Sequence, residues 1–243
     1  MEYAVVIPAR YESTRLPGKP LIELCGVPMV VRTYRRCALA VDADRIHVAT
    51  DDDRIEEVCC SEGIQVIRTS STCLTGTDRV AECAQELDAD TYLNVQGDEP
   101  VFEPADLSLL LDRARSRPDE VLNGCCPIRD REEFNDRSVP KVVCRPDGRL
   151  LYMTRSAVPI GRSGEFSMAF RQVCAYAFPR AALAEFASAE EKTPLESVED
   201  IEILRFLEMG WEVRMIGMSD RSHSVDTPED LARVEGIIRE RGF

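Results

Sequence analysis

The first hundred residues alternate between strand-like and helix-like stretches. Apolar runs at residues 3–7, 45–50, 64–68 and 91–96 have the length of buried strands, and segments of helical spacing separate them. Strands that alternate with helices in this way predict βαβ units and a mostly parallel sheet. We therefore predict an α/β chain with a three-layer, Rossmann-like architecture, folded as a single domain over residues 1–243.

The pattern changes after about residue 121. Strand-like runs at 121–128, 141–144 and 150–154 follow one another with little helix between them. Crowded strands with short turns are typical of antiparallel structure. We predict an inserted antiparallel element over roughly residues 121–186, of a kind that covers a site or forms a dimer interface.

Composition narrows the possible partners. A net charge of −14 argues against a nucleic-acid surface. The chain has no apolar run long enough for a membrane span, and its first residues enter a strand, which leaves no room for a signal peptide. We expect a cytoplasmic protein. The ten cysteines have no C-x-x-C spacing, so we expect reduced, structural thiols.

A basic loop follows the first strand. Residues 7–20 contain Arg10, Arg15 and Lys19, together with hydroxyl side chains such as Ser13. A loop that leaves the carboxyl end of a parallel strand faces the crevice where α/β sheets bind ligands, and its cations can neutralise phosphate oxygens. The loop lacks the Walker pattern. It predicts a phosphate site, and the alternative is a solvated basic loop.

Two acidic turns follow predicted strands farther along the chain. Asp98 comes directly after the strand 91–96, and Gln96 beside it could contact a base or an acceptor. Asp226 precedes a helix start that Thr227 could cap. Magnesium takes one or two carboxylates together with substrate phosphates, so Asp98 fits a metal ligand. Asp226 could be a second ligand or part of the cap.

These segments resemble one family. Residues 10–20, R-x-x-S-x-R-L-P-G-K-P, are similar to the signature loop of the CMP-KDO synthetases, the 3-deoxy-manno-octulosonate cytidylyltransferases. The family's V-Q-G-D-E-P matches residues 95–100, and its V-D-T-P-E-D matches residues 225–230. Its S-G-T-[DE]-R corresponds to residues 75–79, with Thr75 in place of serine. The resemblance implies the fold of nucleotide-diphospho-sugar transferases, with the inserted element as lid and dimer contact.

The resemblance also implies a reaction. CMP would pass from CTP to KDO, a 2-keto-3-deoxy sugar acid, with release of pyrophosphate, in a Mg²⁺-dependent homodimer. An acceptor oxygen would attack the α-phosphorus in line. The residues implied for CTP are Pro8, Ala9, Arg10, Ser13, Lys19, Thr75, Gly76, Thr77, Arg79, Gln96 and Asp98. The residues implied for the acceptor are Arg15, Gln96, Arg155, Gln172, Tyr176 and Glu202. The residues implied for catalysis are Arg10, Arg15, Lys19 and Asp98. The residues implied as Mg²⁺ ligands are Asp98 and Asp226.

Three departures from the family pattern concern the acceptor. Gln172 and Cys174 stand where the H-x-G-x-Y strand has histidine and glycine, and Ile203 replaces the glutamine of L-E-Q-L-R. They suggest a smaller or differently shaped acceptor, so another keto-acid or a small phosphonate such as phosphonoformate is the alternative to KDO. Two other classes are a nucleotide-sugar glycosyltransferase and a non-catalytic nucleotide-binding protein. The basic loop suits a triphosphate better than a diphosphate, and the intact Asp98 and Asp226 argue for catalysis.

Overall fold

The computed structural model describes residues 1–13 and 16–243. Their main sheet has nine strands, seven of which run in the order β11-β7-β10-β6-β1-β4-β5. The strands β6, β1, β4 and β5 are parallel, β11 is parallel to β7, and β10 is antiparallel to both β6 and β7. The bounds of these seven strands are β1 Tyr3–Pro8, β4 Ile46–Thr50, β5 Gln65–Arg68, β6 Thr91–Val95, β7 Val121–Pro127, β10 Phe170–Pro179 and β11 Val213–Gly217.

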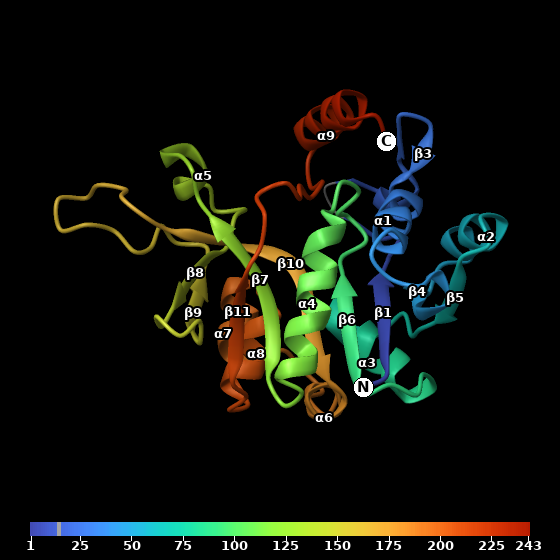
Figure 1. Cartoon of the computed structure of the whole chain (residues 1–243), viewed down its shortest axis with the longest axis horizontal. Coiled ribbons are helices and arrows are strands. Elements are labelled where there is room, and N and C mark those ends of the chain that lie inside the picture. Colours follow the sequence, from blue (N-terminus) through green and yellow to red (C-terminus); the bar gives the residue numbers. More distant parts are fainter. Residues whose placement is uncertain (14–15) are drawn as a thin grey trace.

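Helices cover both faces of the sheet (Figure 1), because alternate residues of the buried strands face opposite sides. In β1, Ala4 and Val6 pack with α3, α6 and α8, whereas Val5 and Ile7 pack with α1, α2 and α4. The three-layer prediction is confirmed. The helices are α1 Met29–Ala38, α2 Asp53–Ser61, α3 Gly76–Glu86, α4 Pro104–Ser116, α5 Arg131–Asn135, α6 Arg180–Phe186, α7 Pro194–Glu199, α8 Ile203–Glu208 and α9 Pro228–Arg241, with short 3₁₀ turns η1 Lys19–Leu21 and η2 Ala43–Arg45.

The inserted element is smaller than the predicted range 121–186. Both β7 and β10 are strands of the main sheet, because the second half of β10 pairs with β6. Outside the seven-strand order lie residues 128–169, which we call the arm; it contains α5, β8 Lys141–Cys144 and β9 Leu150–Thr154 (Figure 1). The antiparallel pairing of β8 with β9 and with the start of β10 joins the arm to the sheet.

Two helix boundaries depend on single residues. Residues 195–207 have helical spacing but form two helices, because Asp200 adopts a left-handed conformation, with φ 53°, at the end of α7. The helix α3 starts at Gly76, and its N-cap is Thr75. The separate two-stranded ribbon β2 Glu23–Leu24 and β3 Val27–Pro28 precedes α1.

All ten cysteines have free thiols, of which Cys25 and Cys60 are exposed and five are buried. No helix within the described part of the chain is both long and apolar enough to cross a membrane.

Candidate active site

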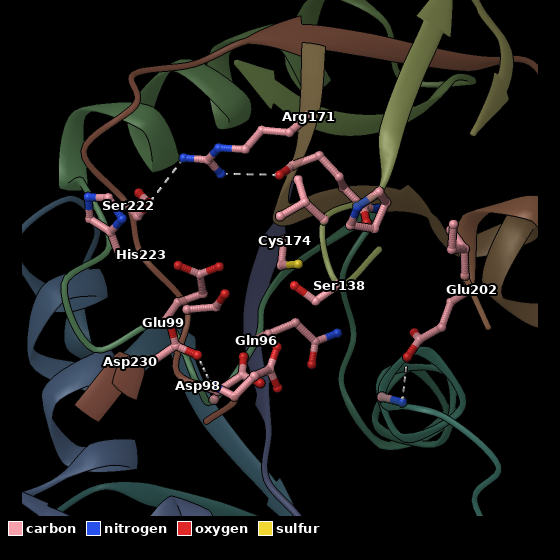
Figure 2. A pocket seen from close by; sticks show the side chains of 18 of the residues that line it. Gln96, Asp98, Glu99, Ser138, Arg171, Cys174, Glu202, Ser222, His223 and Asp230 are labelled. Atoms are coloured by element: carbon pink, nitrogen blue, oxygen red, sulfur yellow. Dashed lines mark hydrogen bonds between the residues drawn. The ribbon is translucent and has the colours of Figure 1, made fainter. Parts of the chain in front are cut away.

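A cleft of about 1040 Å³ lies at the carboxyl ends of β1 and β6 and beneath the start of β10. Every predicted site residue that the structure describes lines this cleft, with the exception of Thr77. Arg15 lies outside the described residues, so its predicted contacts remain a prediction. Figure 2 shows Glu99, Ser222 and His223 on one side of the cleft and Glu202 on the other, with Gln96 and Cys174 between them.

The centre of the cleft is an ion-pair cluster. The Lys19 ammonium lies 2.6 Å from Asp98 Oδ2 and 3.1 Å from Asp226 Oδ1, and it also donates to the Val225 carbonyl. Burial opposes the lysine charge, but attraction by Asp98 and then Asp226 outweighs it and raises the Lys19 pKa above its ordinary value. Segments separated by 79 and 207 positions in the sequence therefore meet at one cation.

Two carboxylates that share one ammonium form a donor set that fits Mg²⁺. No group of three or more histidine, cysteine, aspartate or glutamate side chains within residues 1–13 and 16–243 has a metal-binding arrangement. A metal held by Asp98 and Asp226 would therefore need its other ligands from a nucleotide and from water. That is the usual environment of Mg²⁺ in nucleotide enzymes.

Local structure explains why the two acids meet. A Cβ atom on Gly97 would lie 2.7 Å from the Pro8 carbonyl, so the glycine allows the turn after β6 to approach the end of β1. On the other side, Thr227 caps α9 in a capping box with Asp230, whose carboxylate also accepts from the Asp226 amide. Thr227 is therefore the N-cap of α9, and the Asp226 carboxylate faces Lys19.

Residues 75–79, which we call the nucleotide segment because they are predicted to bind the nucleotide, form the start of α3 and its cap. Thr75 caps the helix, and a Cβ on Gly76 would lie 3.0 Å from the Gln96 amide, so the two segments pack closely. Thr77 is fully buried and donates to Glu202 instead of facing the cleft. Arg79 is 4% exposed and pairs with Asp51 at 2.7 Å.

The predicted acceptor residues have partners within the protein. Gln172 donates to Asn123 Oδ1 at 2.9 Å and to the Tyr176 hydroxyl at 3.1 Å, which fixes both side chains in the cleft wall. The Glu202 carboxylate accepts from the backbone N–H groups of Gly76 and Thr77. Burial, only partly offset by these bonds, raises the Glu202 pKa.

Ile203 does not line the cleft. It is 1% exposed and packs in the hydrophobic core with α3 and α6. The inference from Ile203 to a smaller acceptor is therefore not supported, because this side chain faces away from any ligand. Gln172 and Cys174, the other two departures, do line the cleft.

Several lining residues are not among those predicted for the site, and Glu99, Arg171 and His223 are three of them. Glu99 is 4% exposed, and its Oε2 has no hydrogen-bond partner among the described residues; burial and repulsion by Asp98 raise its pKa to about 8. Burial, together with Arg233 and Arg171, lowers the His223 pKa to about 4. Glu99 lies beside Asp98 and His223 lies close to Asp226 in the sequence, whereas Arg171 has no such neighbour among the predicted site residues.

Comparisons with known proteins agree with this geometry. The family model described as "Cytidylyltransferase" matches residues 4–216. A relative from Arabidopsis thaliana, "3-deoxy-manno-octulosonate cytidylyltransferase, mitochondrial", is 36% identical over 98% of this chain and 83% of its own. The Escherichia coli "3-deoxy-manno-octulosonate cytidylyltransferase" is 35% identical over 96% and 95%.

A solved structure extends the agreement to the fold. It is described as CMP:2-keto-3-deoxy-manno-octonic acid synthetase complexed with CTP, and it superimposes with a TM-score of 0.91 at 35% identity, covering 99% of this chain and all of that one. Identity at this level over nearly the full length of each chain shows membership, and it agrees with the motif resemblance. The chain is a cytidylyltransferase and belongs to the 3-deoxy-manno-octulosonate cytidylyltransferase family.

Proposed function

We propose that this chain transfers CMP from CTP to KDO and releases pyrophosphate. The observation that carries the proposal is the pairing of Lys19 with both Asp98 and Asp226, in the same cleft as the predicted nucleotide residues. A cation beside two carboxylates suits phosphoryl chemistry, in which positioning and charge stabilisation do most of the work. The names of the relatives support KDO as the acceptor.

The basic loop would bind the triphosphate. Arg10 is exposed in the cleft, and Ser13 and Lys19 line it. Asp98 and Asp226 would hold Mg²⁺, which when bound supplies charge neutralisation at the phosphates. With the two carboxylates engaged in this way, the Lys19 ammonium is free to pair with phosphate oxygens. The nucleoside would lie against Pro8, Ala9 and the start of α3.

The acceptor would bind beside Gln96, against the part of the cleft wall that Gln172 and Tyr176 form, which we call the acceptor wall. Gln172 and Tyr176 are already oriented by their mutual hydrogen bond, so they offer polar atoms at fixed positions. An acceptor hydroxyl placed between this wall and Asp98 can approach the α-phosphorus in line, with pyrophosphate leaving toward Arg10 and Lys19. The protein would thus accelerate the reaction by holding CTP and the acceptor acid in a fixed relative orientation.

The arm would form the contact of a homodimer. It exposes three apolar side chains, Leu151 at 58%, Ile160 at 56% and Met168 at 64% of their surface. Exposed large apolar side chains often mark protein interfaces. A second copy of the chain, which presents the same three residues, is the simplest partner.

The proposed reaction is tested by pyrophosphate release from CTP and Mg²⁺ against an acceptor panel of KDO, other 2-keto sugar acids and phosphonoformate. We expect KDO to give the highest kcat/KM. Gln172 and Cys174 line the cleft where the family pattern has histidine and glycine, and these departures favour phosphonoformate as the second candidate. Turnover with phosphonoformate but not with KDO would overturn the acceptor assignment, and no turnover with any acid would overturn the reaction.

A further inference from the structure

Arg155 follows β9 and lines the cleft, and its guanidinium is already occupied by backbone carbonyls. Nε donates to the Glu199 carbonyl at 2.6 Å, and Nη2 donates to the Asp200 carbonyl at 3.0 Å. Nη1 donates to the carbonyls of Arg137 and Ser138, each at 3.2 Å. Four of the five N–H groups of an arginine are thus used within the protein, which leaves one for a ligand.

The first segment that Arg155 joins is the loop 136–140 of the arm. Asp136, Ser138 and Val139 all line the cleft. Lys141 is fully buried and donates to the carbonyls of Asp136, Val139 and Arg155 itself. The loop is therefore held from within by a lysine and from its cleft side by an arginine.

The second segment is the turn between α7 and α8, residues 199–202. The Glu199 carboxylate accepts from the Arg155 amide at 2.9 Å and from the Thr154 hydroxyl at 2.6 Å. Burial opposes the charge of Glu199, but these hydrogen bonds outweigh it and lower the Glu199 pKa. Asp200, in its left-handed conformation, presents its carbonyl to the guanidinium. Side chain and backbone of the turn thus both attach to the end of β9.

The same turn reaches the nucleotide segment. Glu202, two residues beyond Asp200, accepts from the N–H groups of Gly76 at 3.2 Å and Thr77 at 2.9 Å. A series of hydrogen bonds therefore connects the arm loop, Arg155, the turn 199–202 and the start of α3. The Gln172 backbone amide donates to the Pro140 carbonyl at 3.0 Å, which joins the acceptor wall to the arm loop. The acceptor wall and the nucleotide segment thus share one set of contacts, and Arg155 is at its centre.

We propose that Arg155 is a positioning residue that fixes the arm loop 136–140 against the turn 199–202, and through Glu202 sets the distance between the acceptor wall and the nucleotide segment. The proposal rests on the proposed function for its kinetic consequences but on the hydrogen bonds alone for its structural ones. It replaces the expectation that Arg155 is chiefly a ligand of the acceptor.

The substitution Arg155→Lys distinguishes a positioning role from a role as a ligand of the acceptor. A lysine at position 155 keeps the positive charge, so it can still attract an acidic acceptor. It has one nitrogen at the end of a flexible stem and cannot reach both segments at once, whereas the planar guanidinium can. A positioning role therefore predicts that Arg155→Lys is nearly as impaired as Arg155→Ala.

Amide hydrogen exchange on the substrate-free protein tests the structural part. We expect Arg155→Lys to raise exchange in both 136–140 and 199–202, because the two segments lose their common anchor. Glu199→Gln, which leaves the arginine in place, should raise exchange in the turn 199–202 first. Arg162→Ala is the matched control, since Arg162 is an exposed arginine of the arm outside the cleft lining. Unchanged exchange of both segments in Arg155→Lys overturns the proposal, whatever the enzyme's substrate is.

Steady-state kinetics with CTP and KDO test the functional part. We expect kcat/KM for KDO to fall about 100-fold in both Arg155 variants, the size of loss that a misplaced substrate causes. KM for CTP should rise in both, because Glu202 contacts the nucleotide segment. Should Arg155→Lys keep most activity, with only KM for KDO changed, Arg155 would be an acceptor ligand and the proposal wrong. A failure of turnover in the wild type would count against the proposed function and leave the exchange result standing.

Discussion

At the scale of single residues, the site depends on opposite charges gathered from distant parts of an acidic chain. Lys19, the first residue of η1, lies between Asp98, which follows β6, and Asp226, which precedes α9. Such residues are predictable from sequence, because the strand pattern fixes where their side chains emerge. The burial of Glu99 and the backbone contacts of Arg155 are not, since they depend on packing between segments far apart in the chain.

Replacement of Asp226 by asparagine should remove most activity. The change keeps the size of the side chain but removes one of the two carboxylates beside Lys19. We expect kcat to fall about a thousandfold while circular dichroism stays unchanged, because charge stabilisation at the phosphates is the main catalytic term. Asp112→Asn is the control, since Asp112 is an exposed residue of α4. Near-normal turnover of Asp226→Asn would exclude Asp226 as a metal ligand.

Glu99 should make the metal-free protein less stable as pH rises. Its folded pKa of about 8 lies above the ordinary value of 4.5, so between these pH values the folded state keeps a proton that the unfolded state has lost. The stabilising contribution present below pH 4.5 is therefore lost on the way to pH 8. Glu99→Gln does not titrate, so its stability relative to the wild type should increase over this range.

The increase in the unfolding free energy of Glu99→Gln relative to the wild type follows from the Glu99 pKa shift and reaches at most about 5 kcal/mol. Urea unfolding of both proteins with a chelator present, at several pH values from 4.5 to 8, measures it. A constant difference between the two proteins across this range would show that Glu99 is ionised in the folded protein.

At the scale of elements, the strands and most helices were predictable because their apolar spacing is regular. The exceptions are places where one residue's conformation overrides the pattern. Asp200 ends α7 in the middle of a sequence with helical spacing, and the break turns Glu202 toward the start of α3. A left-handed aspartate carries no clear sequence signal, since its backbone is held by tertiary contacts such as the hydrogen bond from Arg155 Nη2 to the Asp200 carbonyl at 3.0 Å.

Two glycine-to-alanine changes separate close packing from helix propensity. A Cβ at Gly97 meets the Pro8 carbonyl at 2.7 Å, whereas a Cβ at Gly236 in α9 has open space around it. We expect Gly97→Ala to destabilise the fold by about 1–3 kcal/mol and to weaken CTP binding, because the turn carrying Asp98 must shift. Gly236→Ala should stabilise the fold by about 0.5–1 kcal/mol. Thermal unfolding and CTP titration measure both, and an unchanged CTP affinity in Gly97→Ala would contradict this packing account.

At the scale of the whole molecule, the alternation of strands and helices was enough to predict three layers and a crevice at one edge. The place of β10 was not predictable, because a strand that runs antiparallel between two others depends on long-range pairing. That strand carries Gln172, Cys174 and Tyr176 over the crevice, and it receives the arm at its start. The acceptor wall is thus the part of the site that sequence patterns describe least well.

The homodimer should depend on the apolar side chains of the arm. Leu151→Asp combined with Ile160→Asp places charges on the proposed interface, where they would be buried without partners. We expect sedimentation velocity to show a dimer for the wild type and a monomer for the double variant. Leu39→Asp is the control, since Leu39 is 70% exposed and lies outside the arm. A monomeric wild type, or a double variant that remains dimeric, would place the interface elsewhere or remove it.

Lys19, Asp98 and Asp226 are proposed to act on one triphosphate and to direct its α-phosphate to an acid. This role is tested by ³¹P NMR of a mixture of the wild-type protein, CTP, Mg²⁺ and KDO. We expect the CTP signals to be replaced by equal amounts of pyrophosphate and a single CMP ester, and we expect Asp98→Asn to give neither while still binding CTP. Formation of CDP and orthophosphate, or ester formation by Asp98→Asn at the wild-type rate, would show that these three residues do not have this role.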